Sequence, residues 1–285
     1  MHISLQVALG LLQPRSLRWR KISGADSSGS AAGPGRQPYK CAKRRGVYFR
    51  EMDTSASEGA RFQPASDQSL LITFGPEISL GAHQQVMKLL RLLQSEPVAS
   101  VRNLHPAYCS LLVKFDGLRI SHDEVEAILR QYLARLEEMQ LPEPRQVEIP
   151  VCYGGEYGPD LDDVCALHGI SPAQAIELHG SAAYLVYFLG FVPGFAYLGG
   201  LPERLVTPRL ATPRRKVPAG SVGIAGNQTG VYPFATPGGW RVIGRTPVAM
   251  FRADRDGLSL LSIGDRVRFA AISTERFAAL EKEWA

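Results

Sequence analysis

A dense run of glycine and proline between residues 188 and 247 constrains the fold of this chain more than any other stretch. It holds 11 of the 28 Gly and 8 of the 20 Pro. Such a composition is typical of a disordered linker, because both residues weaken regular elements. Here large aromatic residues alternate with the turns, and aromatic side chains bury too much area to remain in water. Rigid turns joined by short apolar runs therefore predict a compact β-barrel. The aromatic residues are Phe188, Phe191, Phe195, Tyr197, Tyr232, Phe234 and Trp240.

The same stretch is strongly basic. Seven Lys or Arg residues stand against one acid, Glu203, which is a local balance of 7 − 1 = +6. A cationic surface on a glycine-rich framework is suited to an anion or an acidic partner, and a solvated basic rim is an equally good interpretation. The basic residues are Arg204, Arg209, Arg214, Arg215, Lys216, Arg241 and Arg245.

The net charge of the whole chain does not describe the part that follows residue 50. The formal net charge is +5, but residues 1–50 contain ten basic residues and one acid, or +9, which leaves −4 for the remainder. Nucleic-acid binding is therefore not predicted. Residues 1–65 show no sustained hydrophobic period, and we expect a disordered leader or an artefact of a gene whose translation begins at Met52. A transit peptide is the alternative.

Other global features indicate a soluble, cytoplasmic protein of one or two domains. No apolar run reaches the roughly 18 residues of a membrane-spanning helix, so no membrane association is predicted. The four Cys residues include no CxxC pair, which excludes a disulfide framework and a cysteine metal cluster as leading hypotheses and favours a reducing compartment. We predict no metal site.

Residues 66–148 are predicted to form a small ferredoxin-like domain. Strand patterns at 69–75, 98–105 and 110–117 surround a helical pattern at 78–94, and a capping box at Ser121 begins a second helix. Residues 145–153 are expected to supply the final strand of this split βαβ arrangement. Residues 149–285 then form the barrel domain, and the predicted class is α+β.

Three features of the barrel region could carry chemistry. His179 ends a predicted helix, where the helix dipole favours an imidazolium, so it could bind an anion or move a proton; capping its helix is the simpler role. The segment 217–233 places Gln228 and Thr229 among four glycines, which suits either a ligand loop or a bulged hairpin. Trp240, after a tight turn, could line a site or belong to the core. The sequence contains no phosphate-binding loop, nucleophile elbow or HExxH zinc motif.

Several long motifs resemble one known family. The quoted segments are YGGEYGPDL, IELHGS, FLGFVPGFAYLGGL, TPRLATPRRKVPAGSVGIAGNQTGVYP, TPGGWRVIGRTP and IGDRVRF. Together they resemble the KipI / allophanate hydrolase subunit 1 family over residues 67 to about 272, and most closely its members that are 5-oxoprolinase subunits. The resemblance implies a cyclophilin-like β-barrel from about residue 150, preceded by a small α/β domain.

The resemblance also implies a function, partners and a site. We expect a subunit, inactive alone, of an enzyme that uses ATP, with Mg²⁺, to open 5-oxo-L-proline to L-glutamate. The partners would be a KipA / allophanate hydrolase subunit 2 protein and a LamB/YcsF-like subunit. The alternatives are an inhibitor of a sensor histidine kinase, as for KipI, and an allophanate hydrolase-type amidohydrolase subunit. A shared cleft with the partner would contain His179 as a proton shuttle with a pKa near neutrality. Gln228, Thr229, Tyr232 and Trp240 would surround the substrate, and Arg215 and Lys216 would lie at the phosphates.

Overall fold

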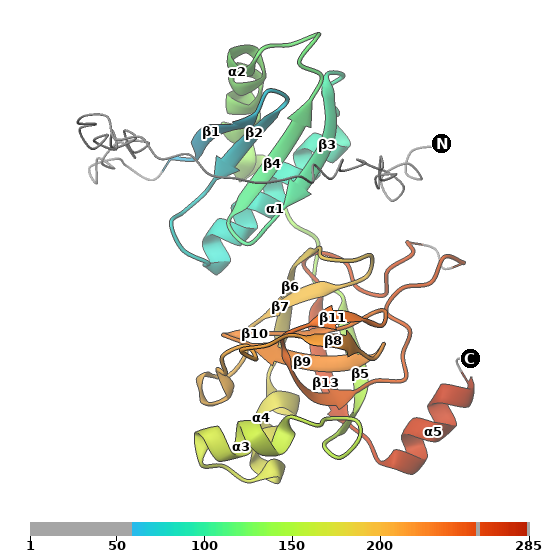
Figure 1. The fold of residues 1–285 in the computed structure, drawn as a ribbon. Coiled ribbons are helices and arrows are strands. Elements are labelled where there is room, and N and C mark those ends of the chain that lie inside the picture. Colours follow the sequence, from blue (N-terminus) through green and yellow to red (C-terminus); the bar gives the residue numbers. More distant parts are fainter. Residues whose placement is uncertain (1–58, 255–256, 284–285) are drawn as a thin grey trace, which may run out of the picture. The chain divides into compact units, whose positions relative to one another are not determined.

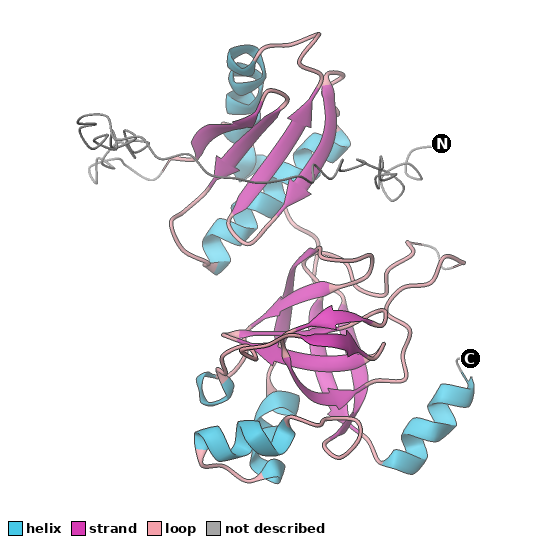
Figure 2. Cartoon of the chain, viewed as in Figure 1, coloured by secondary structure: helices cyan, strands magenta, loops and turns pink. Residues whose placement is uncertain are grey.

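The computed structural model describes residues 59–254 and 257–283, and the chain is α+β with a closed β-barrel (Figures 1 and 2). A leader was expected at residues 1–65. Residues 1–58 of it, Met52 included, lie outside the described residues. Its last residues belong to the first strand, β1 (Arg61–Ser66). None of the described helices is long and apolar enough to cross a membrane.

The N-terminal part is a four-stranded antiparallel sheet with two helices. The strands run in the order β1, β2 (Ser69–Thr73), β4 (Ser110–Phe115), β3 (Val101–Pro106). The helices α1 (Leu80–Ser95) and α2 (His122–Leu133) contribute apolar stripes to a core shared with the inner face of the sheet. The expected capping box lies at the N-terminal end of α2, where the side chains of Ser121 and Glu124 each accept a hydrogen bond from the other's backbone N–H group.

One expectation about this sheet is wrong. Residues 145–153 do form a strand, β5 (Gln146–Tyr153), but β5 pairs in parallel with β13 (Arg266–Ala271) and antiparallel with β12 (Arg241–Arg245) in the barrel. The edge position beside β2 is taken by β1. The hydrophobic pattern of β5 could not show whether the strand belongs to the N-terminal sheet or to the barrel. Ile149 and Val151 are fully buried and would suit the core of either one.

Seven strands close the barrel in the order β10, β7, β6, β13, β5, β12, β9. The strands not yet given are β6 (Tyr184–Leu189), β7 (Ala196–Gly199), β9 (Ser221–Ala225) and β10 (Gln228–Val231). Alternate residues of the strands point inward and make one apolar core, as barrel closure requires. The Gly- and Pro-rich stretch thus forms most of the barrel, which confirms the prediction drawn from it.

Shorter elements surround the barrel. A two-stranded ribbon pairs β8 (Arg214–Val217) with β11 (Thr236–Gly238). Two helices, α3 (Leu161–His168) and α4 (Pro172–Ser181), add residues to the barrel core, and α5 (Thr274–Glu283) follows the last strand. Short 3-10 turns lie at Leu136–Glu138 and Glu203–Leu205. In Figure 1, α3 and α4 lie side by side at one end of the barrel.

Glycines in β9 and β10 allow aromatic rings to lie directly on the barrel wall. Gly223 and Gly230 face each other across the two strands. A Cβ atom on Gly230 would stand 3.2 Å from the rings of Phe195 and Trp240, and one on Gly223 would stand 3.1 Å from the Cβ of Trp240. The hairpin between the strands turns at Gly226, whose φ of 55° lies in the left-handed region that glycine adopts without strain. Residues 221–231 of the segment 217–233 therefore form a hairpin.

Candidate functional site

His179 lies in the interior of the barrel, with none of its surface exposed. It belongs to the last turn of α4, yet its ring points inward and stacks on Phe269 with centroids 4.6 Å apart. Its Nδ1 lies 2.7 Å from the Tyr153 hydroxyl and its Nε2 lies 3.0 Å from Thr229 Oγ1. Both ring nitrogens are therefore satisfied by side chains of β5 and β10.

The hydrogen bonds fix the tautomer of His179. The Thr229 hydroxyl donates its proton to the Gly223 carbonyl at 3.0 Å, because a carbonyl can only accept. Thr229 Oγ1 must then accept from His179 Nε2–H, which leaves Nδ1 to accept from the Tyr153 hydroxyl. Three strands of the barrel are joined in this way through one neutral imidazole.

Burial lowers the pKa of His179 to about 3. The expectation of a near-neutral pKa is therefore wrong: desolvation disfavours the charged ring, and the helix end does not compensate for it. A general acid or base working at neutral pH needs a pKa close to that pH and a path to the reacting atoms. The geometry of His179 instead suits a group that holds Tyr153 and Thr229 in place.

Gln228 and Thr229 have different environments although they are adjacent. The Thr229 side chain is fully buried in the network of His179. The Gln228 side chain is half-buried, and its Nε2 donates to the hydroxyl of Tyr108. Because successive strand residues point to opposite faces, only Gln228 can reach a ligand on the outer wall of the barrel.

Tyr232 and Trp240 lie in a second apolar cluster on the outer wall. They are 2% and 5% exposed, and Phe195 contacts both rings edge-on at centroid distances of 5.4 and 5.5 Å. Phe188 and Tyr197 extend the cluster with a stacked pair 4.4 Å apart. Trp240 is thus buried, as the simpler alternative expected, and an aromatic surface of partly exposed rings continues beside it.

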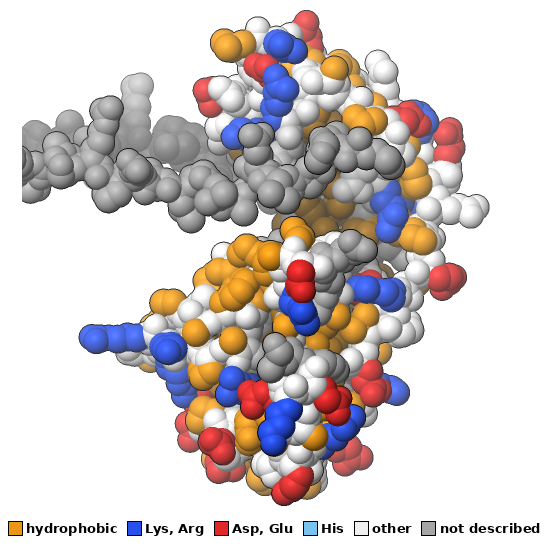
Figure 3. Space-filling view, turned by 90° about the vertical axis from the view of Figure 1, so that its right-hand side faces the viewer, with side chains coloured by type: hydrophobic (Ala, Val, Ile, Leu, Met, Phe, Trp, Pro, Cys, Tyr) orange, Lys and Arg blue, Asp and Glu red, His pale blue; other side chains and the backbone are white. Residues whose placement is uncertain are grey.

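Arg215 and Lys216 lie on β8 and are exposed. Within the described part of the chain neither side chain makes a hydrogen bond or an ion pair, so both charges remain available to an anion. The structure brings His179 and Thr229 together and brings Tyr232 and Trp240 together, and it places Arg215 and Lys216 in neither group. On the face shown in Figure 3, Lys and Arg side chains are interspersed with Asp and Glu.

A buried ion pair beside these residues was not predicted from the sequence. Asp160, 3% exposed, accepts two hydrogen bonds from Arg214, at 2.6 and 2.8 Å, and a third from the Val242 amide at 2.6 Å. The pair ties the start of α3 to β8 and to β12. The sequence pattern does not reveal the pair, because the partners are 54 residues apart. The one local feature is that Asp160 stands immediately before α3, a position that Asp often takes at a helix start.

Comparison with known proteins places these features in a family. The family description "carboxyltransferase domain, subdomain C and D" matches residues 60–261. The chain is 40% identical over 233 residues to the B-type 5-oxoprolinase subunit of Bacillus subtilis, covering 78% of this chain and 97% of that protein. It is 44% identical over 211 residues to the B-type 5-oxoprolinase subunit of Escherichia coli O157:H7, covering 74% and 95% respectively.

Solved structures give the same fold. The crystal structure of TTHA0988 is similar with a TM-score of 0.64 at 36% identity, and the match covers 72% of this chain. This chain spans only 40% of that solved chain. The Kluyveromyces lactis urea carboxylase has a TM-score of 0.65 at 19% identity over 79% of this chain and 23% of its own. At that identity the likeness shows a common fold alone.

Proposed function

Because the chain belongs to the carboxyltransferase-domain family that includes the B-type 5-oxoprolinase subunits, we propose that it is a subunit of a 5-oxoprolinase. The main support for this proposal is the match to these curated relatives, at 40 and 44% identity over 97 and 95% of their lengths. The likeness therefore extends over nearly the whole of both relatives rather than over one shared module.

The proposed reaction opens 5-oxo-L-proline to L-glutamate with ATP. The lactam is a stable amide, so its carbonyl carbon must first be made more electrophilic before water can add to it. Transfer of the γ-phosphoryl group forms an O–P bond at the lactam oxygen and releases ADP. Water then adds to the ring carbon, the C–N bond breaks as nitrogen takes a proton, and the resulting acyl phosphate is hydrolysed by a second water to glutamate and phosphate.

Partner proteins belong to the same proposal. The chain has no phosphate-binding loop of its own, and its relatives carry a name that implies other subunits. The proposed partners are a KipA-type and a LamB/YcsF-type subunit, with which the chain would be active in the cytoplasm and without which it would be inactive. The proposed organisation is a ferredoxin-like domain followed by a cyclophilin-like barrel. The boundary expected between residues 148 and 149 falls inside β5, which belongs to the barrel, so the proposed boundary moves to about residue 145.

Within that complex, groups on the outer wall of the barrel and on β8 are the proposed contacts. Gln228 would hydrogen-bond the lactam or carboxylate, beside the aromatic cluster of Tyr232 and Trp240. Arg215 and Lys216 would neutralise phosphate charge, and Arg is the better partner because its planar fork can bind two oxygens. His179 and Thr229 would act by positioning the barrel wall rather than by moving protons.

Replacing Arg215 by Gln tests the phosphate assignment. In the assembled complex, 5-oxoproline opening should require ATP, and the variant should raise the KM for ATP about tenfold, because a charge-assisted contact is lost. The KM for 5-oxoproline should change little. A matched control is Arg268→Gln, an exposed residue on β13. Unchanged ATP kinetics in the Arg215 variant, with assembly intact, would remove this residue from the nucleotide site.

A further inference from the structure

A cavity of 550 Å³ lies against α1 and is distinct from the groups proposed above. Its walls come from α1, from the segment 141–145, from Leu185 of β6 and from the loop 262–266 that leads into β13. The volume falls within the range of small-molecule sites, about 300 to 1,000 Å³. None of the residues assigned to the proposed 5-oxoprolinase site lines it.

Two arginine side chains that line this cavity have no hydrogen-bond or ion-pair partner among the described residues. Arg91 of α1 and Arg266 of β13 line it, and neither side chain has a hydrogen bond or ion pair with any residue that the structure describes. Arg145, which also lines the cavity, is different: it binds Asp265 through two contacts, at 2.5 and 3.2 Å. The free acid of the site is Glu143, so the unpaired groups leave a net positive charge, which suits a carboxylate or phosphate.

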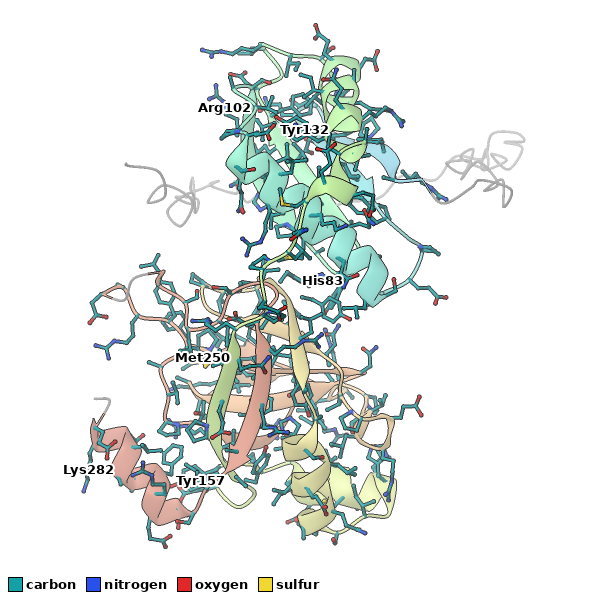
Figure 4. The ribbon with its side chains drawn as sticks, turned by 180° about the vertical axis from the view of Figure 1, so that it is seen from behind. His83, Arg102, Tyr132, Tyr157, Met250 and Lys282 are labelled. Atoms are coloured by element: carbon teal, nitrogen blue, oxygen red, sulfur yellow. The ribbon has the colours of Figure 1, made fainter. Side chains whose placement is uncertain are left out.

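His83 adds an unsatisfied polar group to the same walls. It is 2% exposed, and its ring packs edge-on against Tyr187 at 4.7 Å. Although the Tyr108 backbone lies nearby, neither ring nitrogen has a partner of hydrogen-bond geometry in the described chain. Burial lowers the pKa of His83 to about 4, so the neutral ring presents one donor and one acceptor. Figure 4 shows this side chain on α1.

A buried donor or acceptor that has no hydrogen-bond partner destabilises the fold, so such groups usually meet a partner. The remaining walls are mainly apolar and include Leu80, Met87, Leu141 and Ile263. Apolar walls with a few placed polar groups are typical of a ligand site.

We propose that this cavity binds a small organic anion. Arg91 and Arg266 hold its carboxylate or phosphate head, the apolar walls hold its body, and His83 meets a polar atom of the ligand or a water bound with it. The site is independent of the proposed oxoprolinase chemistry, and its occupant is defined by an anionic head on an apolar body.

Three six-carbon probes separate these contributions. Hexanoate and hexyl phosphate carry the two possible heads, and hexanol carries none. Binding is measured by calorimetry on the full chain and by the ring ¹⁵N signals of its histidines, of which there are six; the His83→Phe variant identifies the His83 signal. We expect at least one anion to bind about tenfold more tightly than hexanol and to shift the His83 signal.

Variants test where the head binds. The double variant Arg91→Gln, Arg266→Gln should remove the advantage of the anion over hexanol, and Glu143→Gln should increase it. Arg268→Gln, two residues along the same strand, should change nothing. If neither anion binds more tightly than hexanol, or if the double variant keeps the preference, the proposal is overturned. Comparing hexanoate with hexyl phosphate then assigns the head group.

Discussion

Replacing Asp160 by Asn should lower the free energy of unfolding of the barrel by about 3 kcal/mol. The buried carboxylate takes two hydrogen bonds from Arg214 and one from the Val242 amide. An Asn keeps the size of the side chain but removes the charge and turns an N–H₂ group toward one of these donors. The Arg214 guanidinium then stays partly buried without the carboxylate that it contacts directly, and Asp163 is the remaining acid near it.

The neighbouring residue Asp163 provides a matched control for this substitution. It contacts Arg241 at 3.5 Å, but its side chain is 70% exposed. Asp163→Asn should therefore change stability by less than about 0.5 kcal/mol, as expected for a surface pair. Urea unfolding followed by circular dichroism and tryptophan fluorescence measures both variants. Equal effects for Asp160→Asn and Asp163→Asn would mean that the buried pair contributes no more than a surface pair.

Acidification from pH 7 to pH 5 should destabilise the folded chain by about 4 kcal/mol through two buried histidines. Burial holds the pKa of His179 at about 3 and that of His83 at about 4, whereas both are near 6.5 in the unfolded chain. Below pH 6.5 the unfolded state therefore binds protons that the folded state does not. Each histidine contributes about 2 kcal/mol by pH 5, and the loss grows until the folded pKa is reached.

Single variants measure how much of this pH dependence of stability each of the two histidines contributes. His179→Phe should be less stable at pH 7, because it loses the hydrogen bonds to Tyr153 and Thr229, whereas His83→Phe loses no side-chain hydrogen bond within the described chain. Each variant should lose about half of the difference between pH 7 and pH 5. The carboxyls of Glu96 and Asp116, whose pKa values are lowered by Arg135 and Arg102, titrate below this window. Equal urea midpoints for the native sequence at pH 7 and pH 5 would contradict the account.

The sequence predicted the barrel because its signal is local. Aromatic residues placed between Gly and Pro turns can be buried only by short strands, and Gly223 and Gly230 lie where Phe195 and Trp240 rest on the wall. The partner of β5 was not predictable in this way. The hydrophobic pattern of β5 suits a buried strand in either sheet. Its pairing with β12 and with β13, which lies 120 residues further along the chain, places it in the barrel.

The chemistry of single side chains depended on burial, which the sequence pattern did not reveal. His179 was expected at a helix end, where exposure would give a near-neutral pKa, but the last turn of α4 points it into the barrel. Asp160 and His83 were not expected to matter, because their partners or neighbours lie far away in the sequence. Arg215 and Lys216 were expected to be available, and exposure on β8 leaves them so.

If this chain is a required subunit of a 5-oxoprolinase, glutamate formation should depend on it in an add-back titration. Partner subunits are mixed with ATP, Mg²⁺ and 5-oxo-L-proline, the chain is added in steps, and L-glutamate is followed. We expect no glutamate without the chain, and a rate that rises with added chain and saturates at a fixed ratio to its partners. Glutamate formation at the same rate in the absence of the chain would contradict the claim.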